Sequence, residues 1–246
     1  MTTLKVNAIE PEGATTNLVI GESGQNTVIS NNDIRANVLQ DAGGNAIFTS
    51  DGSGNVSGVN SGFGGSVALL STQTASNSAS ISFTSGIDST YGEYIFKFYN
   101  INPATDNTDF SFQVNSTNDA GGGYDTSLIT SGAFTSSHDE ANTAVAEVSY
   151  DTGGDLAQSA NFQVLCRDCG NGADESCAGV MHLFSPSSTT YVKHFYATAE
   201  YMHEGSWART QYTAGYINDA SYAIDDIQFK MSSGNFDGTI KMWGVK

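Results

Sequence analysis

Alternation of apolar and polar residues dominates the chain from about residue 67 onward. A period of two is typical of a β-strand with one buried face. The clearest alternating segments are 93–99, 109–114, 161–165, 180–184, 190–203, 209–217, 223–231 and 238–245. They predict about ten strands in about 180 residues, which is enough for a two-sheet, jelly-roll-like β-sandwich. The expected fold class is therefore all-β.

The first 62 residues follow a different pattern, in which single apolar positions are separated by turn-forming segments rich in Gly, Asn and Asp. These apolar positions recur at a spacing of nine or ten residues: Ile9, Val19, Val28, Val38, Ile47 and Val56. The pattern indicates short strands joined by tight turns, which bury too little apolar area to be stable alone. We therefore expect an N-terminal arm over 1–62, packed on identical copies or on a larger assembly, a flexible joint at 61–66 and a sandwich over 63–246.

One segment admits a helix as an alternative to a strand. Within 139–148, apolar residues occur at positions 141, 144, 145 and 148, and the acidic pair at its start suits a helix N-terminus. A pattern this short is often overridden by strand pairing, so the strand is the stronger expectation.

The net charge of the chain argues against some classes of binding partner. The 246 residues include 9 Lys and Arg against 26 Asp and Glu, a formal net charge of −17. Such a surface repels phosphate, so binding to nucleic acid or to anionic lipid is not expected. The first ten residues lack the apolar stretch of a secretory signal, and no run reaches the ~20 apolar residues of a membrane span. We expect synthesis in the cytoplasm without a signal peptide and without membrane insertion.

Three cysteines and a histidine form the most specific candidate site. Cys166, Cys169, Cys177 and His182 have the spacing C-x2-C-x7-C-x4-H, and thiolates with imidazole are zinc ligands. The spacing departs from common zinc motifs, so a hairpin of 162–165 with 180–184 is the competing interpretation. In that hairpin a disulfide from Cys177 to Cys166 or Cys169 would close the loop after exposure to an oxidising medium, or the thiols would stay free.

Aromatic side chains gather between positions 191 and 216. Alternation places one set of residues 193–201 inward and the other outward, so some rings are expected at the surface or at a subunit interface. Packing between subunits is the favoured interpretation and contact with a glycan the alternative. The candidate glycan contacts are Tyr196, Tyr201, Trp207 and Tyr212. No carboxylate pair or Ser-His arrangement stands in a catalytic context, so we expect neither enzyme activity nor a cofactor.

Three stretches resemble known phage modules. Residues 92–124 combine an aromatic strand, the turn Pro103-Ala-Thr-Asp106, a second alternating strand and a Gly-rich turn, and 233–245 resembles the closing strand of the same module. This module recurs in tail-fibre and appendage proteins of tailed bacteriophages. Residues 38–54 are similar to N-terminal attachment segments of short-tailed marine phages.

The resemblance implies a virion structural protein. It would be a homotrimeric fibre or fibre-like appendage that binds other virion proteins through residues 1–62 and presents its sandwich to the host surface. A capsid decoration protein is the alternative within the virion. A free glycan-binding or glycan-cleaving β-sandwich is the alternative outside it.

Overall fold

The computed structural model describes residues 38–41, 43–59, 66–119 and 123–246, and every element in them is a β-strand. The chain divides into two compact units, Met1–Phe63 and Gly64–Lys246. The expected strands around Ile9, Val19 and Val28 lie outside the described residues, as do positions 61–65 of the expected joint.

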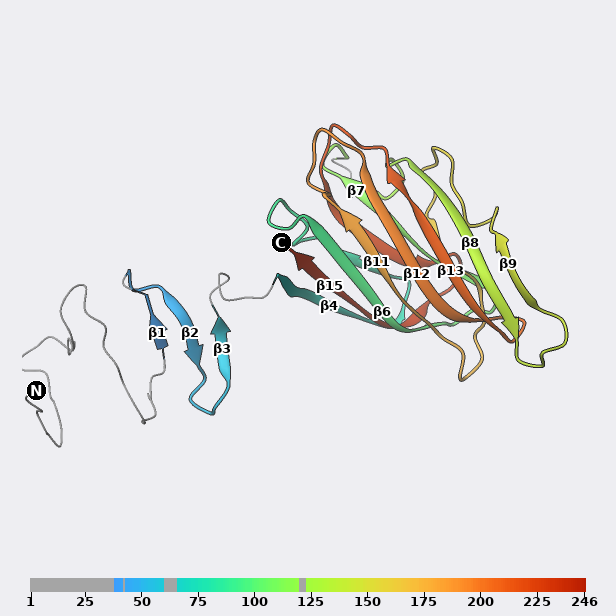
Figure 1. Ribbon diagram of the computed structural model, residues 1–246, viewed down its shortest axis with the longest axis horizontal. Helices are drawn as coiled ribbons and strands as arrows, with labels where there is room; N and C mark the ends of the chain where they lie inside the picture. Colours follow the sequence, from blue (N-terminus) through green and yellow to red (C-terminus); the bar gives the residue numbers. More distant parts are fainter. Residues whose placement is uncertain (1–37, 42, 60–65, 120–122) are drawn as a thin grey trace, which may run out of the picture. The chain divides into compact units, whose positions relative to one another are not determined.

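The described part of the first unit is a three-stranded antiparallel sheet with the order β1-β2-β3 (Figure 1). Its strands are β1 (Val38–Gln40), β2 (Ala46–Ser50) and β3 (Val56–Val59). The two turns are built alike: the carboxylate of Asp41 accepts N–H bonds from Gly43 and Asn45, and that of Asp51 accepts them from Ser53 and Asn55. Such side-chain bonds fix tight turns without help from a core.

Twelve strands form the second unit. They are β4 (Val67–Ser78), β5 (Ser80–Phe83), β6 (Glu93–Pro103), β7 (Thr108–Ser116), β8 (Ile129–Asp139), β9 (Ala146–Tyr150), β10 (Gln163–Cys169), β11 (Cys177–Phe184), β12 (Lys193–His203), β13 (Trp207–Ile217), β14 (Ile224–Met231) and β15 (Phe236–Val245).

All twelve strands pair antiparallel in one sheet that folds over into two layers. The broad layer has the order β4-β15-β6-β11-β12-β13-β8-β9, and the narrow layer has the order β5-β14-β7-β10. A single residue pair, Cys169 opposite His203, joins β10 to β12 and so links the layers. Figure 1 shows β6, β11, β12, β13 and β8 side by side in the broad layer.

Aromatic rings from both layers meet in the core. Phe96 of β6 lies 5.5 Å from Phe229 of β14, Phe98 of β6 lies 5.3 Å from Phe110 of β7, and Phe112 of β7 lies 5.1 Å from Phe195 of β12, measured between ring centroids. All of these rings are buried. The structure therefore confirms the predicted all-β fold with its two packed layers.

The predicted hairpin of 162–165 with 180–184 is wrong. Strand β11 pairs with β6 and β12, whereas β10 pairs with β7 and reaches β12 only at its last residue. The connection 170–176 thus crosses from the narrow layer to the broad one. Alternation shows that a strand has one buried face, but it does not show which layer the strand belongs to, because the strands of both layers have a buried face.

The helical alternative for 139–148 is also wrong. The Asp139 carboxylate ends β8 by accepting N–H bonds from Thr143 (2.9 Å) and Ala144 (3.0 Å), which closes a tight turn and lowers its pKa to about 2. Strand β9 then pairs with β8, and Val148 remains 73% exposed. A helix here would have had no core surface on which to bury its apolar stripe.

Candidate functional site

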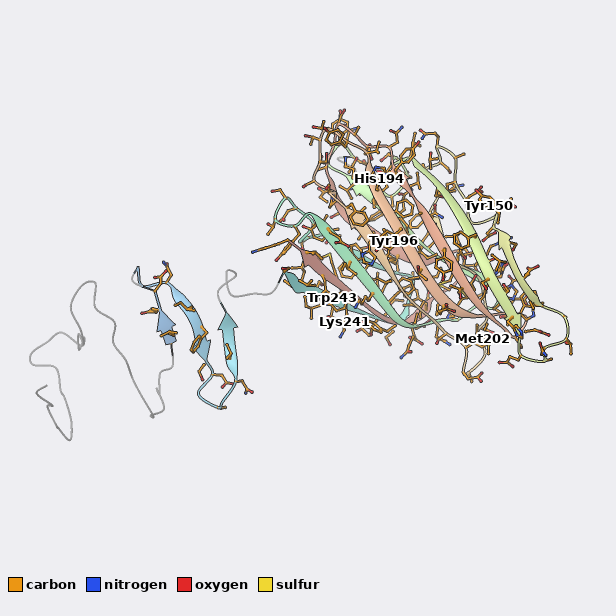
Figure 2. All side chains as sticks on the ribbon, in the orientation of Figure 1. Tyr150, His194, Tyr196, Met202, Lys241 and Trp243 are labelled. Atoms are coloured by element: carbon orange, nitrogen blue, oxygen red, sulfur yellow. The ribbon has the colours of Figure 1, made fainter. Side chains whose placement is uncertain are left out.

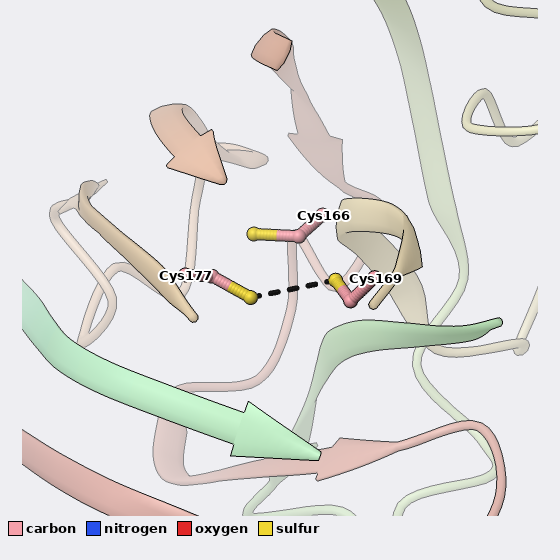
Figure 3. A group of neighbouring side chains, drawn as sticks. All are labelled: Cys166, Cys169 and Cys177. Atoms are coloured by element: carbon pink, nitrogen blue, oxygen red, sulfur yellow. Dashed lines mark hydrogen bonds between the residues drawn. The ribbon is translucent and has the colours of Figure 1, made fainter. Parts of the chain in front are cut away.

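The three cysteine sulfurs lie together in the core (Figure 3). One of them, Cys169, is the β10 residue whose pairing with His203 joins the two layers. All three Sγ atoms are within 4.8 Å of one another, and those of Cys169 and Cys177 are 3.4 Å apart. Each cysteine is at most 1% exposed. Within the described residues, this is the only group of three or more metal-ligating side chains close enough to share an ion.

An irregularity in β10 brings Cys166 and Cys169 to the same face. Strict alternation would place residues three apart on opposite faces of a strand. The pairing of β10 with β7 shifts register between Cys166 and Cys169, and Asp168 adopts a left-handed backbone with φ of 54°. The extra residue absorbed there turns the Cys169 side chain back into the core.

The cluster shares hydrogen bonds among its sulfurs. Burial raises the pKa of Cys166, since an apolar surrounding disfavours a thiolate. Hydrogen bonds from Cys166 and Cys169 instead lower the pKa of Cys177. Cys177 is therefore the sulfur that carries the negative charge most readily.

His182 does not join the cysteines, which corrects the predicted four-residue set. Five positions separate it from Cys177 on β11, so the two side chains point to opposite faces of that strand. The His182 ring lies on the outer face, where its Nδ1 is 2.5 Å from Oε1 of Glu93 and its ring stacks on Tyr196 with a centroid distance of 4.4 Å.

The four candidate glycan contacts are divided between the two faces of the broad layer. Tyr196 and Tyr212 are 44% and 40% exposed on its outer face. Tyr201 is buried, and its hydroxyl accepts a bond from the Arg167 N–H and donates to Gln211. Trp207, the first residue of β13, is half-buried and stacks on His203, the last residue of β12. The prediction is therefore wrong for Tyr201, and Trp207 lies apart from the exposed pair.

Tyr196 and Tyr212 border a shallow groove on the outer face of the broad layer. The groove has a volume of about 210 Å³, and its lining includes Gly132, Phe134, Tyr196, Thr198, Tyr212 and Ala214. Gly132 and Ala214 are cross-strand neighbours whose small side chains leave the floor low. Tyr212 stacks on Phe134 at a centroid distance of 4.7 Å and forms one wall with it. We call this feature the aromatic groove; Figure 2 shows Tyr196 and Tyr150 on the same broad face.

Polarity is inverted around the aromatic groove. In the middle of β8 and β13 the inward side chains are small or polar: Ala133, Thr135, Ser137, Gln211 and Thr213 are all buried. The large apolar pair Ile129 and Ile217 is buried at one end of the two strands. The outward side chains include Phe134, which is 47% exposed, and Tyr212, with Tyr150 of β9 next in the row at 59%. The sequence analysis did not identify Phe134 and Tyr150 as surface aromatics. The residues around them are mostly polar, so the segments show no apolar alternation that would mark a strand with a buried face.

No family model, curated protein or solved structure matches this chain. The residues described contain no helix long and apolar enough to cross a bilayer.

Proposed function

We propose that this chain is a non-enzymatic structural protein of a tailed-bacteriophage virion, a trimeric fibre or fibre-like appendage attached through residues 1–62. The main support for this proposal comes from the first unit, where no described residue from 38 to 56 is buried. Val38, Leu39 and Val56 are 41%, 42% and 58% exposed. A three-stranded sheet without a core gains stability by packing on symmetry mates or on a host surface.

The connectivity of the second unit supports the same proposal. Strands β4-β15-β6-β11 and β5-β14-β7-β10 alternate early and late strands of the chain, as the two four-stranded sheets of a jelly roll do. On this interpretation the hairpins β8–β9 and β12–β13 are insertions that pair with each other and widen one layer. Jelly rolls are frequent in viral capsid and lectin domains.

Copy number in purified particles tests the proposal and its nearest alternative. Quantitative mass spectrometry should find the protein in the particle at on the order of tens of copies if it forms an appendage built from symmetric trimers. Hundreds of copies would identify a capsid decoration protein instead. Absence from particles would reject both.

The role of the N-terminal unit has its own test. Replacing Leu39 and Val56 together by Ser removes apolar area that the three-stranded sheet itself leaves exposed, so the trimer population and incorporation into particles should fall at least tenfold. Ser53→Ala, in an exposed turn of the same unit, is the matched control and should change neither. Unchanged assembly of the double variant would contradict attachment through this unit.

The aromatic groove supports glycan contact as a second candidate function. Tyr196 faces a floor of small side chains across from the Tyr212–Phe134 stack, an arrangement that could hold a sugar ring between aromatic walls. Tyr196→Ala should weaken adsorption to host cells by about tenfold, equal to ~1.4 kcal/mol. Tyr191→Ala removes a 73% exposed ring outside the groove and should leave adsorption unchanged.

Two other results of that experiment would remove the glycan proposal. Equal adsorption of Tyr196→Ala and the unsubstituted protein would show that the groove binds no receptor. Loss of the trimer in Tyr196→Ala would show that subunits pack through this face, as the favoured interpretation of the aromatic cluster expects. A separate assay tests for enzyme activity: release of reducing ends when the protein is incubated with host polysaccharide would support a glycan-cleaving enzyme.

A further inference from the structure

Two of the three clustered cysteines lie at strand ends. Cys169 is the last residue of β10 and Cys177 the first residue of β11, with the connection 170–176 between them. Cys166 lies within β10, where it is paired opposite Phe110 of β7. Cys169 is paired with Thr108 and His203, and Cys177 with Ile101 and Tyr201, but a residue at the end of a strand still moves at lower cost than one in its interior.

The distance between the sulfurs favours the same pair. The Sγ atoms of Cys169 and Cys177 are already in contact at 3.4 Å (Figure 3), and a disulfide requires them to approach to about 2.05 Å. Both cysteines lie next to β12, opposite His203 and Tyr201 respectively, so a bond between them would tie the narrow layer to the broad one.

We infer that Cys169 and Cys177 are a disulfide pair that closes when the protein meets an oxidising low-molecular-weight disulfide, and that Cys166 stays a thiol. This inference selects one pairing from those that the sequence left open. It goes beyond the proposed function and does not depend on it, since any oxidising environment suffices.

The chemistry is a balanced thiol–disulfide exchange. The Cys177 thiolate attacks one sulfur of glutathione disulfide and releases one glutathione thiolate, which takes up the proton of Cys169. The Cys169 thiolate then attacks the Cys177 sulfur and releases the second glutathione. Two protein thiols are oxidised and one glutathione disulfide is reduced. Both sulfurs are buried, so the reagent enters only when the 170–176 connection opens, and the reaction is slower than at an exposed thiol.

The sequence itself supplies a discriminating test by peptide mapping. Trypsin cleaves after Lys97, Arg167 and Lys193, which places Cys166 on peptide 98–167 and the other two cysteines together on peptide 168–193. The full chain is incubated with glutathione disulfide, denatured, alkylated and then digested. Peptide 168–193 should then carry no alkyl group and be two hydrogens lighter than the same peptide with two free thiols. Peptide 98–167 should carry one alkyl group.

Three results would overturn the inference. Linkage of peptide 98–167 to peptide 168–193 would show that Cys166 takes part in the disulfide. Alkylation of all three cysteines after prolonged incubation would show that no disulfide forms. A stoichiometric thiophilic metal ion retained by the purified protein would assign the cluster to metal binding.

Variants and thermal unfolding give a second measurement. The bond closes a short loop between the layers, so oxidation should raise Tm by about 5 °C. Cys166→Ala should keep this shift on oxidation, whereas Cys169→Ala should lose it. A shift that survives in Cys169→Ala would contradict the assigned pair, and the wild-type peptide map decides the question even if a variant does not fold.

Discussion

The ion pair between Arg167 and Asp151 gives a quantitative prediction. Nη1 of Arg167 lies 2.5 Å from Oδ1 of Asp151, whose side chain is only 3% exposed, while that of Arg167 is 35% exposed. Exposed pairs contribute about 0–1 kcal/mol, and removing one partner of a fully buried pair costs about 3–5 kcal/mol. With one buried and one partly solvated partner, Arg167→Ala should lower the free energy of unfolding by about 2 kcal/mol.

A double-mutant cycle measures the part of this loss that belongs to the pair. Urea unfolding of Arg167→Ala, Asp151→Ala and the double variant should give a coupling energy of about 1–2 kcal/mol. For a unit of this size, the single Arg167 variant should lose about 4–8 °C in Tm. Lys246→Ala removes the same charge at the exposed chain end and should leave Tm unchanged. Additivity of the two single effects within about 0.5 kcal/mol would refute the argument.

Three further predictions concern the core, a close strand contact and acid stability. Phe229 contacts Phe83, Phe96, Phe110 and Phe112, so Phe229→Ala should cost about 3–5 kcal/mol in urea unfolding and Phe229→Leu clearly less; equal losses would contradict the packing argument. A Cβ at Gly179 would lie 2.4 Å from the Thr198 carbonyl oxygen, so Gly179→Ala should lower Tm, whereas Gly92→Ala meets no atom within 4 Å and should be neutral. The pKa of Asp139 is lowered from 3.8 to about 2, so its stabilising effect is present above pH 4 and is lost as the pH falls through 2. Thermal unfolding between pH 5 and pH 2 should therefore show a flatter acid decline for Asp139→Ala.

Alternation predicted individual strands well where apolar residues occupy every second position. Within β12 it separated the buried set Lys193, Phe195, Ala197, Ala199 and Tyr201 from the outward set, and the structure confirms that division. Alternation did not say which set is inward, and the structure places Lys193 in the buried set with Phe195. Its ammonium is buried and donates to the carbonyl oxygens of Asp219 and Tyr222, which hold the connection to β14.

Strand partners could not be predicted in the same way. Strand β15 lies between β4 and β6, far from both in sequence, and no local pattern records such a pairing. The hairpin proposed for the cysteine segment failed for this reason. The proximity of the three cysteines depends on the irregular backbone at Asp168, which the sequence does not predict. The separation of His182 from Cys177 could have been predicted, because residues five apart on one strand lie on opposite faces.

The polarity is inverted in the middle of β8 and β13, although Ile129 and Ile217 at one end of the pair are buried in the usual way. A strand normally turns its apolar residues toward the core, yet here Thr135, Ser137 and Gln211 point inward while Phe134 and Tyr212 point outward. Burying hydroxyl and amide groups brings less stability than burying rings, so the fold alone would favour the opposite orientation. Rings kept outward at this cost are best explained by a second surface that covers them in use. That requirement agrees with the proposed trimer and with glycan contact, and a monomer with no ligand for this face would contradict both.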